Sequence, residues 1–307
     1  MTLDDRIARH PIGLGTAPLG SRADGPLWWG PQDRDEAVLT VCAAIDAGAS
    51  FIDTAPFYGW GLAEQIVGEA IADRSDTPPI LTKCGVVPLD DGSAADDASP
   101  TSIRRGIESS LENLGRDRID VVQVHDPDPA TPIEDTWEEL HAAVDEGLIG
   151  GAGLSNHPID LMERALAVGP IAVVQHQSSA LFRRTVRSGI VDWCREGGIP
   201  FLSWAPLASG FLADDFDLAE LHPDDLRHRL PWAGDRVDVT RRVRATVQRM
   251  ADDLGTDLTR ASLAVAAHGD GVAAIVGSRS VVEATELGRP IPELSTEQIA
   301  AIDEAAG

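Results

Sequence analysis

Four polar residues with complementary acid–base chemistry lie at or just after the ends of three apolar segments. Asp53 ends the first segment and Tyr58 follows it in a short loop; Lys83 lies near the end of the second, and His125 ends the third. A phenol normally titrates at roughly pH 10, and a buried ammonium beside it favours the phenolate and lowers that pKa. If the fold brings these residues together, Tyr58 can act as general acid when a carbonyl is reduced and as general base when an alcohol is oxidised.

This group is unusual because the chain contains a single lysine and a single tyrosine, and both belong to it. Taken alone, each residue has a structural explanation: a turn aspartate, a packed tyrosine, a solvated lysine or a satisfied histidine. Together these explanations require four independent coincidences. We therefore predict a joint site in which Asp53 pairs with Lys83 and keeps the amine charged, while His125 donates a hydrogen bond to the reacting oxygen.

Eight short apolar segments predict the strands that must position these residues. Several are apolar on both faces, as in residues 119–124, which is typical of parallel strands buried on both sides. The predicted strands span residues 12–15, 50–54, 79–84, 119–125, 149–155, 171–175, 199–204 and 272–276.

Amphipathic segments between the strands predict helices, with Gly48 and Gly115 as stop signals. These helices span residues 33–47, 62–72, 101–114, 132–147, 159–167, 186–196 and 239–254, with an extra terminal helix at 294–305. The alternation predicts an α/β protein, a single (β/α)8 TIM barrel over residues 1–307. The long loops 86–99 and 205–238 each follow a strand, so we expect them on the C-terminal face, where the active sites of such barrels lie.

The composition disfavours several classes of function. Fifty acidic residues against 25 basic ones give a net charge of −25, which disfavours binding to nucleic acid. The three cysteines are scattered, which suits a reducing compartment. Neither the cysteines nor the histidines have metal-ligand spacing, which disfavours a metal site. Residues 1–10 are polar, and no apolar run is long enough to span a membrane. We expect a cytoplasmic protein with a small-molecule substrate, of undetermined oligomeric state.

The segment 51–59, FIDTAPFYG, resembles the signature of the aldo-keto reductase superfamily. Segments 63–70, 81–83, 119–125 and 153–156 are similar to further motifs of that superfamily, and the resemblance covers residues 13–287. Within the superfamily the chain is most similar to bacterial aldose dehydrogenases and general sugar or aldehyde reductases. The resemblance implies a catalytic tetrad of Asp53, Tyr58, Lys83 and His125. A histidine at the last position goes with carbonyl chemistry rather than with reduction of carbon–carbon double bonds.

The resemblance also implies a site for a nicotinamide dinucleotide. Ser155, Asn156 and Gln175 would hydrogen-bond the carboxamide, and Trp204 would stack on the nicotinamide ring. Segment 206–212 would cover the pyrophosphate, and segment 277–279 would begin the adenosine site at a helix N-terminus. The full expected set is Gly15, Thr16, Ser155, Asn156, Gln175, Trp204, Ala205, Pro206, Leu207, Ser209, Gly210, Gly277, Arg279 and Glu283.

Two of these residues bear on the choice of cofactor. Arg279 could pair with a 2′-phosphate and favour NADP(H), whereas Glu283 could repel that phosphate, hydrogen-bond a ribose hydroxyl and favour NAD(H). We expect NADP(H), with NAD(H) as the alternative.

Aromatic residues in the loops predict the substrate pocket, because aromatic walls suit both aldehydes and the apolar faces of sugars. The candidates are Trp28, Trp29, Phe57, Trp60 and Trp232.

Two other functions stay compatible with the residues. Lys83 on a barrel strand could form a Schiff base, as in an aldolase, although Asp53 would keep the amine protonated and poorly nucleophilic. The non-enzymatic alternative is a cofactor-sensing barrel subunit with little turnover. The complete tetrad favours an NAD(P)(H)-dependent oxidoreductase that acts on an aldehyde, ketone or sugar.

Overall fold

The apolar segments form a closed barrel of eight parallel strands. The structure is a computed structural model that describes residues 1–89 and 93–307. Around the barrel the strands follow the order β1 (Ile12–Gly15), β10 (Val272–Gly277), β9 (Phe201–Trp204), β8 (Val173–Gln177), β7 (Ala152–Ser155), β6 (Val121–Val124), β3 (Ile80–Cys84) and β2 (Ile52–Asp53), which returns to β1. Each predicted strand overlaps one of these. The predicted barrel fold is therefore confirmed.

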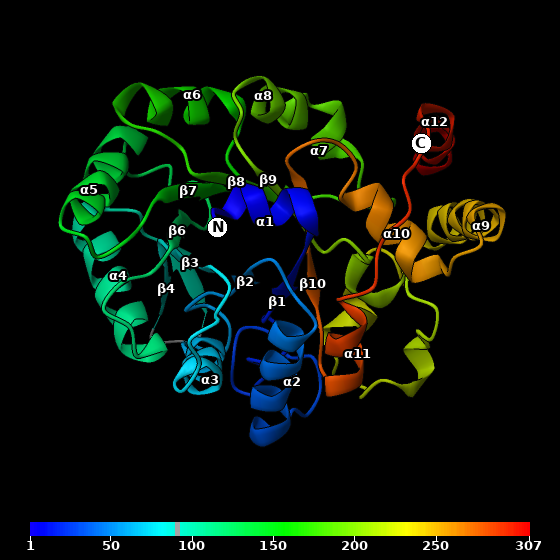
Figure 1. Cartoon of the computed structure of the whole chain (residues 1–307), viewed down its shortest axis with the longest axis horizontal. Helices are drawn as coiled ribbons and strands as arrows, with labels where there is room; N and C mark the ends of the chain where they lie inside the picture. Colours follow the sequence, from blue (N-terminus) through cyan, green and yellow to red (C-terminus); the bar gives the residue numbers. More distant parts are fainter. Residues whose placement is uncertain (90–92) are drawn as a thin grey trace.

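Helices surround the barrel as an outer ring (Figure 1). They are α2 (Arg34–Asp46), α3 (Leu62–Ile71), α4 (Pro100–Leu114), α5 (Ile133–Asp145), α6 (Ile159–Val168), α7 (Arg184–Arg187), α8 (Ile190–Glu196), α9 (Val237–Leu254), α10 (Leu258–Ala266), α11 (Val281–Glu286) and α12 (Thr296–Ala306). The predicted helix over 186–196 is split, because Gly189 adopts a left-handed φ of 81° between α7 and α8. Helix α10 was not predicted.

Two apolar layers hold the barrel together. One layer packs the outer faces of the strands against the helices. The other fills the barrel interior with side chains that include Phe51, Leu81, Val173 and Leu202. Burial on both sides is the reason that most residues of the strands are apolar.

A short helix that the sequence did not predict, α1 (Leu3–Arg9), closes the N-terminal end of the barrel. Thr2 and Asp5 form a capping box at its start. Ile7 is buried and joins the apolar cluster of the barrel interior. Figure 1 views the barrel with α1 in front of the strands. Helix α1 thus closes the N-terminal end of the barrel, which leaves the C-terminal end for the predicted active site.

The two long loops follow strands, as predicted, and carry local structure. The loop after β3 contains a hairpin, in which β4 (Val86–Pro88) pairs antiparallel with β5 (Ala94–Asp96). Part of its turn, residues 90–92, lies outside the described residues. The loop after β9 contains three short 3₁₀ segments, η1 (Ala208–Gly210), η2 (Leu218–Glu220) and η3 (Leu226–Arg229). Both loops therefore add residues to the C-terminal face.

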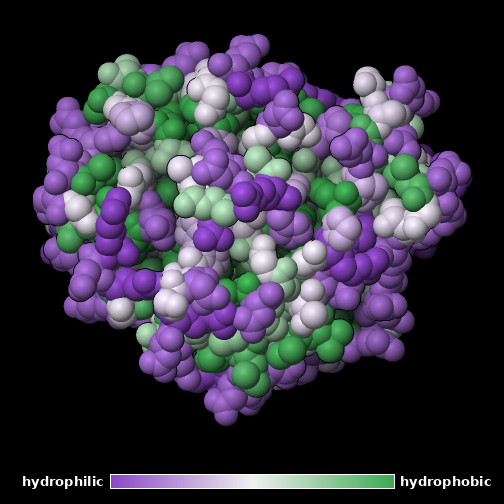
Figure 2. All heavy atoms as spheres, in the orientation of Figure 1, coloured by the Kyte–Doolittle hydropathy of each residue, from purple (hydrophilic) through white to green (hydrophobic). Residues whose placement is uncertain are grey.

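Polar side chains cover much of the surface. Figure 2 shows hydrophilic residues spread over the face that carries α1, with hydrophobic atoms visible in separate areas between them. This distribution agrees with the net charge of −25. In the described ranges, no helix has both the length and the apolar character needed to cross a membrane.

Candidate active site

The four predicted catalytic residues meet at the C-terminal mouth of the barrel. Asp53 is the last residue of β2, Lys83 lies in β3, and His125 comes directly after β6. Tyr58 lies in the loop between β2 and α3. Strands β2, β3 and β6 are neighbours in the barrel, and Lys83 is in register with Gln123. Adjacent parallel strands therefore bring the four side chains to one corner.

Lys83 is the centre of this group. Its Nζ donates hydrogen bonds to Asp53 Oδ1 at 2.6 Å, to the carbonyl oxygen of Thr54 at 3.0 Å and to the hydroxyl of Tyr58 at 3.1 Å. Burial acts to lower the pKa of this amine, but the charge of Asp53 and the contact with Tyr58 outweigh it, so the pKa of Lys83 lies above its usual value. The amine is thus charged, as predicted, and all three of its N–H donors are in use.

Asp53 is held from three sides. It is 1% exposed, and its second oxygen accepts a hydrogen bond from Gln123 Nε2 at 3.3 Å. The backbone N–H and the hydroxyl of Thr16 donate to the carbonyl oxygen of Asp53 at 3.0 and 3.1 Å. Gln123 was not predicted from the sequence. A polar residue within the buried strand segment 119–125 needs a hydrogen-bond partner, and this requirement could have indicated its role.

Tyr58 departs from one expectation. The predicted lowering of its pKa is wrong for the chain without cofactor. Burial raises the pKa of the phenol above its usual value, and the negative charge of Asp53 adds to this effect; Lys83 acts in the predicted, opposite direction but does not prevail. Tyr58 is therefore a neutral phenol whose oxygen already accepts a hydrogen bond from an ammonium. This arrangement favours proton donation to a substrate oxygen over proton abstraction.

His125 faces Tyr58 edge-on. The two ring centroids are 6.1 Å apart with an angle of 86° between the rings, and Phe57 packs on His125 in the same manner at 5.8 Å. Burial, together with the nearby charge of Lys83, lowers the pKa of His125 to about 3. The imidazole is therefore neutral and can offer a hydrogen bond to a substrate oxygen without carrying charge.

A cavity of about 180 Å³ adjoins His125. Its lining residues are Phe57, Val86, Ala94, Ala95, Asp96, His125 and Asp126. The cavity thus combines one predicted catalytic residue, one predicted substrate residue and the hairpin of β4 and β5. Asp96 and Asp126 were not predicted; for Asp126 the available signal was its position directly after His125 at a strand end.

The remaining predicted aromatic residues have different surroundings. Trp60 packs edge-on against Phe57 at 5.5 Å and supports the cavity wall. Trp28 and Trp29 contact the loop after β9, where Trp28 lies against His222 and Trp29 under Arg227.

Trp232 is a correction to the predicted substrate pocket. It is 6% exposed and lies in a separate hydrophobic cluster that includes Val243 and Val247 of α9. The apolar face of α9 explains this placement, because it buries the indole against the helix.

The residues expected around the nicotinamide lie in or just after β7, β8 and β9. Gln175 is buried, and its Oε1 has no hydrogen-bond partner among the described residues, so it offers an acceptor to a carboxamide N–H. Asn156 is already engaged: it accepts from Trp204 Nε1 at 3.0 Å and donates to the His125 carbonyl and to Asp126 Oδ1 at 3.2 and 3.0 Å. Its side chain therefore orients Trp204. Ser155 is buried at the end of β7.

Left-handed backbone conformations gather in these loops. Within the described ranges, the non-glycine residues with positive φ are Trp60, Asn156, Ala205, Ala208 and Ser209. All lie in loops that follow strands of the barrel. Such conformations are unfavourable for residues with a Cβ and concentrate at ligand sites. The loop predicted to cover a pyrophosphate, which includes Pro206, Leu207 and Gly210, thus has the backbone character of a binding loop.

Two glycines allow neighbouring side chains to pack closely against β1 and β10. A Cβ at Gly15 would lie 2.8 Å from Ile275 Cγ2, and one at Gly277 would lie 3.0 Å from Pro18 Cγ. Next to Gly277, the buried hydroxyl of Ser278 has no hydrogen-bond partner among the described residues. The unpaired hydroxyl of Ser278 is thus the feature here that fits a polar ligand group.

Arg279 and Glu283 do not present the free groups that the sequence suggested. The guanidinium of Arg279 donates to the carbonyl oxygens of Trp29 and Pro31, both at 2.5 Å, and to Gln32 Oε1 at 3.2 Å. Glu283 accepts from the backbone N–H of Arg279 at 2.6 Å, at the start of α11. Arg279 thus holds the loop after β1 in place through these hydrogen bonds. A 2′-phosphate would have to compete with the three acceptors for the guanidinium of Arg279.

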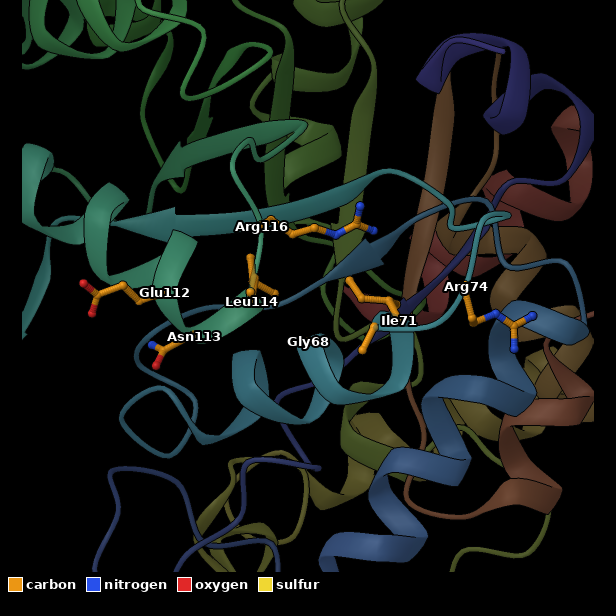
Figure 3. Close-up of a pocket in the computed structure, with 9 residues that line it drawn as sticks. Gly68, Ile71, Arg74, Glu112, Asn113, Leu114 and Arg116 are labelled. Atoms are coloured by element: carbon orange, nitrogen blue, oxygen red, sulfur yellow. The ribbon is translucent and has the colours of Figure 1, made fainter.

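A larger cavity, of about 370 Å³, lies between the C-terminal ends of α3 and α4. Figure 3 shows its lining, which includes Arg74, Asn113 and Arg116. Helix C-termini lie at the N-terminal face of a βα barrel, which is the face opposite the catalytic group. Arg74 pairs with Asp46. This cavity contains none of the predicted site residues.

The fold is a (β/α)8 barrel, and its C-terminal mouth holds a buried phenol, ammonium and carboxylate beside a small cavity. Residues 11–306 match the family described as Aldo/keto reductase family. An NADH-specific methylglyoxal reductase of Escherichia coli is 33% identical over 224 residues, which are 69% of this chain and 67% of that protein. This chain belongs to the aldo/keto reductase family, as its sequence motifs indicated, and is an NAD(P)(H)-dependent oxidoreductase of carbonyl substrates.

Two solved structures are similar over most of the chain. A glycerol dehydrogenase from Gluconobacter oxydans has a TM-score of 0.83 and 28% identity, with 96% of this chain and 90% of that chain covered. An aldo-keto reductase from Klebsiella pneumoniae, in complex with NADPH, has a TM-score of 0.70 and 25% identity, with the same coverage.

Proposed function

We propose that this enzyme reduces a small aldehyde or ketone with Tyr58 as the proton donor. The observation that carries the proposal is the hydrogen bond of 3.1 Å from the buried ammonium of Lys83 to the Tyr58 hydroxyl. A bound nicotinamide supplies the hydride. The hydride forms the new bond to the carbonyl carbon, the π electrons move to oxygen, and that oxygen takes the proton of Tyr58. Lys83 stays protonated and stabilises the phenolate of Tyr58 that results. Solvent then restores the proton of Tyr58.

Asp53 and His125 support this step without exchanging a proton. Asp53 keeps Lys83 charged and oriented at 2.6 Å. The neutral His125 beside Tyr58 can donate a hydrogen bond to the same substrate oxygen and thereby orient the carbonyl. The reverse reaction uses the same groups with the phenol deprotonated.

The cofactor is proposed to lie along Gln175, Trp204, the loop over residues 205–210 and the start of α11. The unpaired acceptor of Gln175 and the unpaired hydroxyl of Ser278 support this path. Relatives include both an NADH-specific enzyme and a protein solved with NADPH. We propose NADP(H) as the cofactor, with NAD(H) as the alternative. The preference for the 2′-phosphate depends on how well it competes with Trp29, Pro31 and Gln32 for hydrogen bonds from Arg279.

The Schiff-base alternative finds no support in the geometry. Lys83 is charged and donates to three oxygens, so it has no free electron pair for attack on a carbonyl. No observation favours a cofactor-sensing subunit over an enzyme.

The decisive experiment is Tyr58→Phe. We expect turnover of a carbonyl panel to fall by about 10²–10⁴-fold, the range for loss of a general acid, with the dissociation constant for NADPH or NADH within a few-fold of the wild type. Fluorescence titration of the reduced cofactor measures the binding. Turnover near the wild-type rate in this variant rules out the proton-transfer role.

A further inference from the structure

The cavity beside His125 has acidic walls. Asp126 is half-buried, and its Oδ1 accepts a hydrogen bond from Asn156 Nδ2 at 3.0 Å. Asp96 is the last residue of β5, is exposed, and belongs to the part of the lining that the hairpin contributes. The other lining residues are Phe57, Val86, two alanines and His125, so the described lining contains no cationic side chain.

The nearest cation cannot offset these carboxylates through contact. Lys83 influences Asp126 electrostatically. However, its three N–H donors are used by Asp53, Thr54 and Tyr58. His125, which also lines the cavity, is neutral because burial and Lys83 lower its pKa to about 3. A negatively charged substrate group therefore finds no counter-ion within this lining.

Asp126 carries a negative charge at pH values above its raised pKa. Burial raises its pKa to about 6; Asp96 acts in the same direction, while Asn156 and Lys83 act against it. On the hairpin side, burial and Asp128 raise the pKa of Asp96. Above roughly pH 7 Asp126 is thus mostly ionised, and a partly buried charge is screened less by salt than an exposed one.

We infer that this cavity selects neutral polyhydroxylated or cationic carbonyl substrates and discriminates against carbonyl compounds that carry a carboxylate or phosphate. The inference rests on the proposed function, since it assigns the cavity to the substrate of Tyr58 and His125. Carboxylate oxygens of Asp126 and Asp96 accept hydrogen bonds from hydroxyl groups and attract a quaternary ammonium group, whereas they repel an anion brought into the same space.

Matched substrate pairs test this inference. Betaine aldehyde and 3,3-dimethylbutanal have nearly the same shape and differ by one positive charge. Succinic semialdehyde and its methyl ester differ by one negative charge. For the wild type at pH 7.5 we expect kcat/KM for betaine aldehyde to exceed that for its neutral counterpart. We expect kcat/KM for succinic semialdehyde to be at least about 10-fold below that for its ester, equivalent to about 1.4 kcal/mol.

Two variants locate the effect. Asp126→Asn keeps an acceptor for Asn156, and Asp96→Asn alters an exposed residue on the cavity rim. Each should move both charged-to-neutral ratios toward one, with the larger change in D126N, because that carboxylate is less exposed. The ratios compare two substrates in the same variant, so a general loss of activity cancels. The control is Glu108→Gln, which removes an exposed carboxylate on α4 outside the cavity lining and should leave both ratios unchanged.

The outcomes separate this inference from the proposed function. Absence of turnover with both neutral aldehydes, with either reduced cofactor, contradicts the proposed function. Turnover of the neutral aldehydes with charged-to-neutral ratios near one in the wild type contradicts the inference alone. Equal changes of the ratios in D126N, D96N and E108Q overturn it as well, because they assign the discrimination to the net charge of the whole protein.

Discussion

Replacing Asp53 by asparagine removes one charge from a deeply buried ion pair while keeping the shape of the side chain. The side chains of Asp53 and Lys83 are each 2% exposed, with 2.6 Å between Oδ1 and Nζ. At an effective dielectric constant of about 20, opposite unit charges at that distance attract by about 6 kcal/mol. Part of this attraction is offset by the cost of burying the carboxylate. We therefore expect D53N to lower the free energy of unfolding by about 3–5 kcal/mol.

The same variant should change how the rate depends on pH. Burial acts to lower the pKa of Lys83, and Asp53 is the main group that opposes this effect. Without the carboxylate, the pKa of Lys83 falls, and the amine loses its charge as the pH rises through the new value. The phenolate of Tyr58 then lacks a neighbouring cation, so kcat/KM for carbonyl reduction should decrease with rising pH in a range in which the wild type is flat.

Urea unfolding and a pH profile of kcat/KM measure the two effects. Glu64→Gln is the matched control, because Glu64 is equally buried, its hydrogen bonds come from the neutral Thr82 and Asn113, and Lys83 has only a small effect on its pKa. E64Q should cost less than about 2 kcal/mol and keep the wild-type profile. A D53N protein with wild-type stability and a wild-type profile would refute the reasoning that Asp53 maintains the charge of Lys83.

Two further predictions concern the adenosine site and the buried histidines. Glu283→Gln should tighten NADPH binding relative to NADH by roughly fivefold, since it removes about 1 kcal/mol of repulsion of the 2′-phosphate; unchanged relative dissociation constants in a fluorescence titration would contradict this. Burial lowers the pKa of His157 to about 4. The folded state binds His157 in its neutral form, so the free energy of unfolding is highest above the unfolded pKa of about 6.5. It decreases as the pH falls toward 4, by on the order of 2 kcal/mol between pH 8 and pH 5. His157→Gln should flatten this part of the urea-unfolding profile, and an equally steep profile would speak against the role of His157.

The barrel could be predicted because its signals are local. Eight apolar segments, spaced by amphipathic helices, determine a parallel barrel, and the polar residues at the strand ends then have to meet at one face. Elements that depend on distant contacts were missed. Helix α1 has one buried residue, Ile7, and is stabilised by the barrel interior that it closes. The hairpin of β4 and β5 lies in a segment whose polar composition indicates only a loop.

The catalytic group followed from residue types, whereas its electrostatics did not. The sign of the pKa shift of Tyr58 depends on how burial and Asp53 compare with Lys83, which requires coordinates. The partners of Arg279 are similarly invisible in the sequence, since Trp29 and Pro31 offer backbone carbonyls that any residue type possesses. Trp232 shows the same limit for apolar residues, because only the packing of α9 distinguishes a core tryptophan from a pocket tryptophan.

The burial of Lys83 makes acylating reagents selective for one position on the folded chain. Because the chain has no other lysine, and the ε-amine is charged, enclosed and bonded to three oxygens, an amine-reactive dye should attach to the α-amino group alone. A second dye per molecule would then report that the barrel mouth has opened far enough to release its amine.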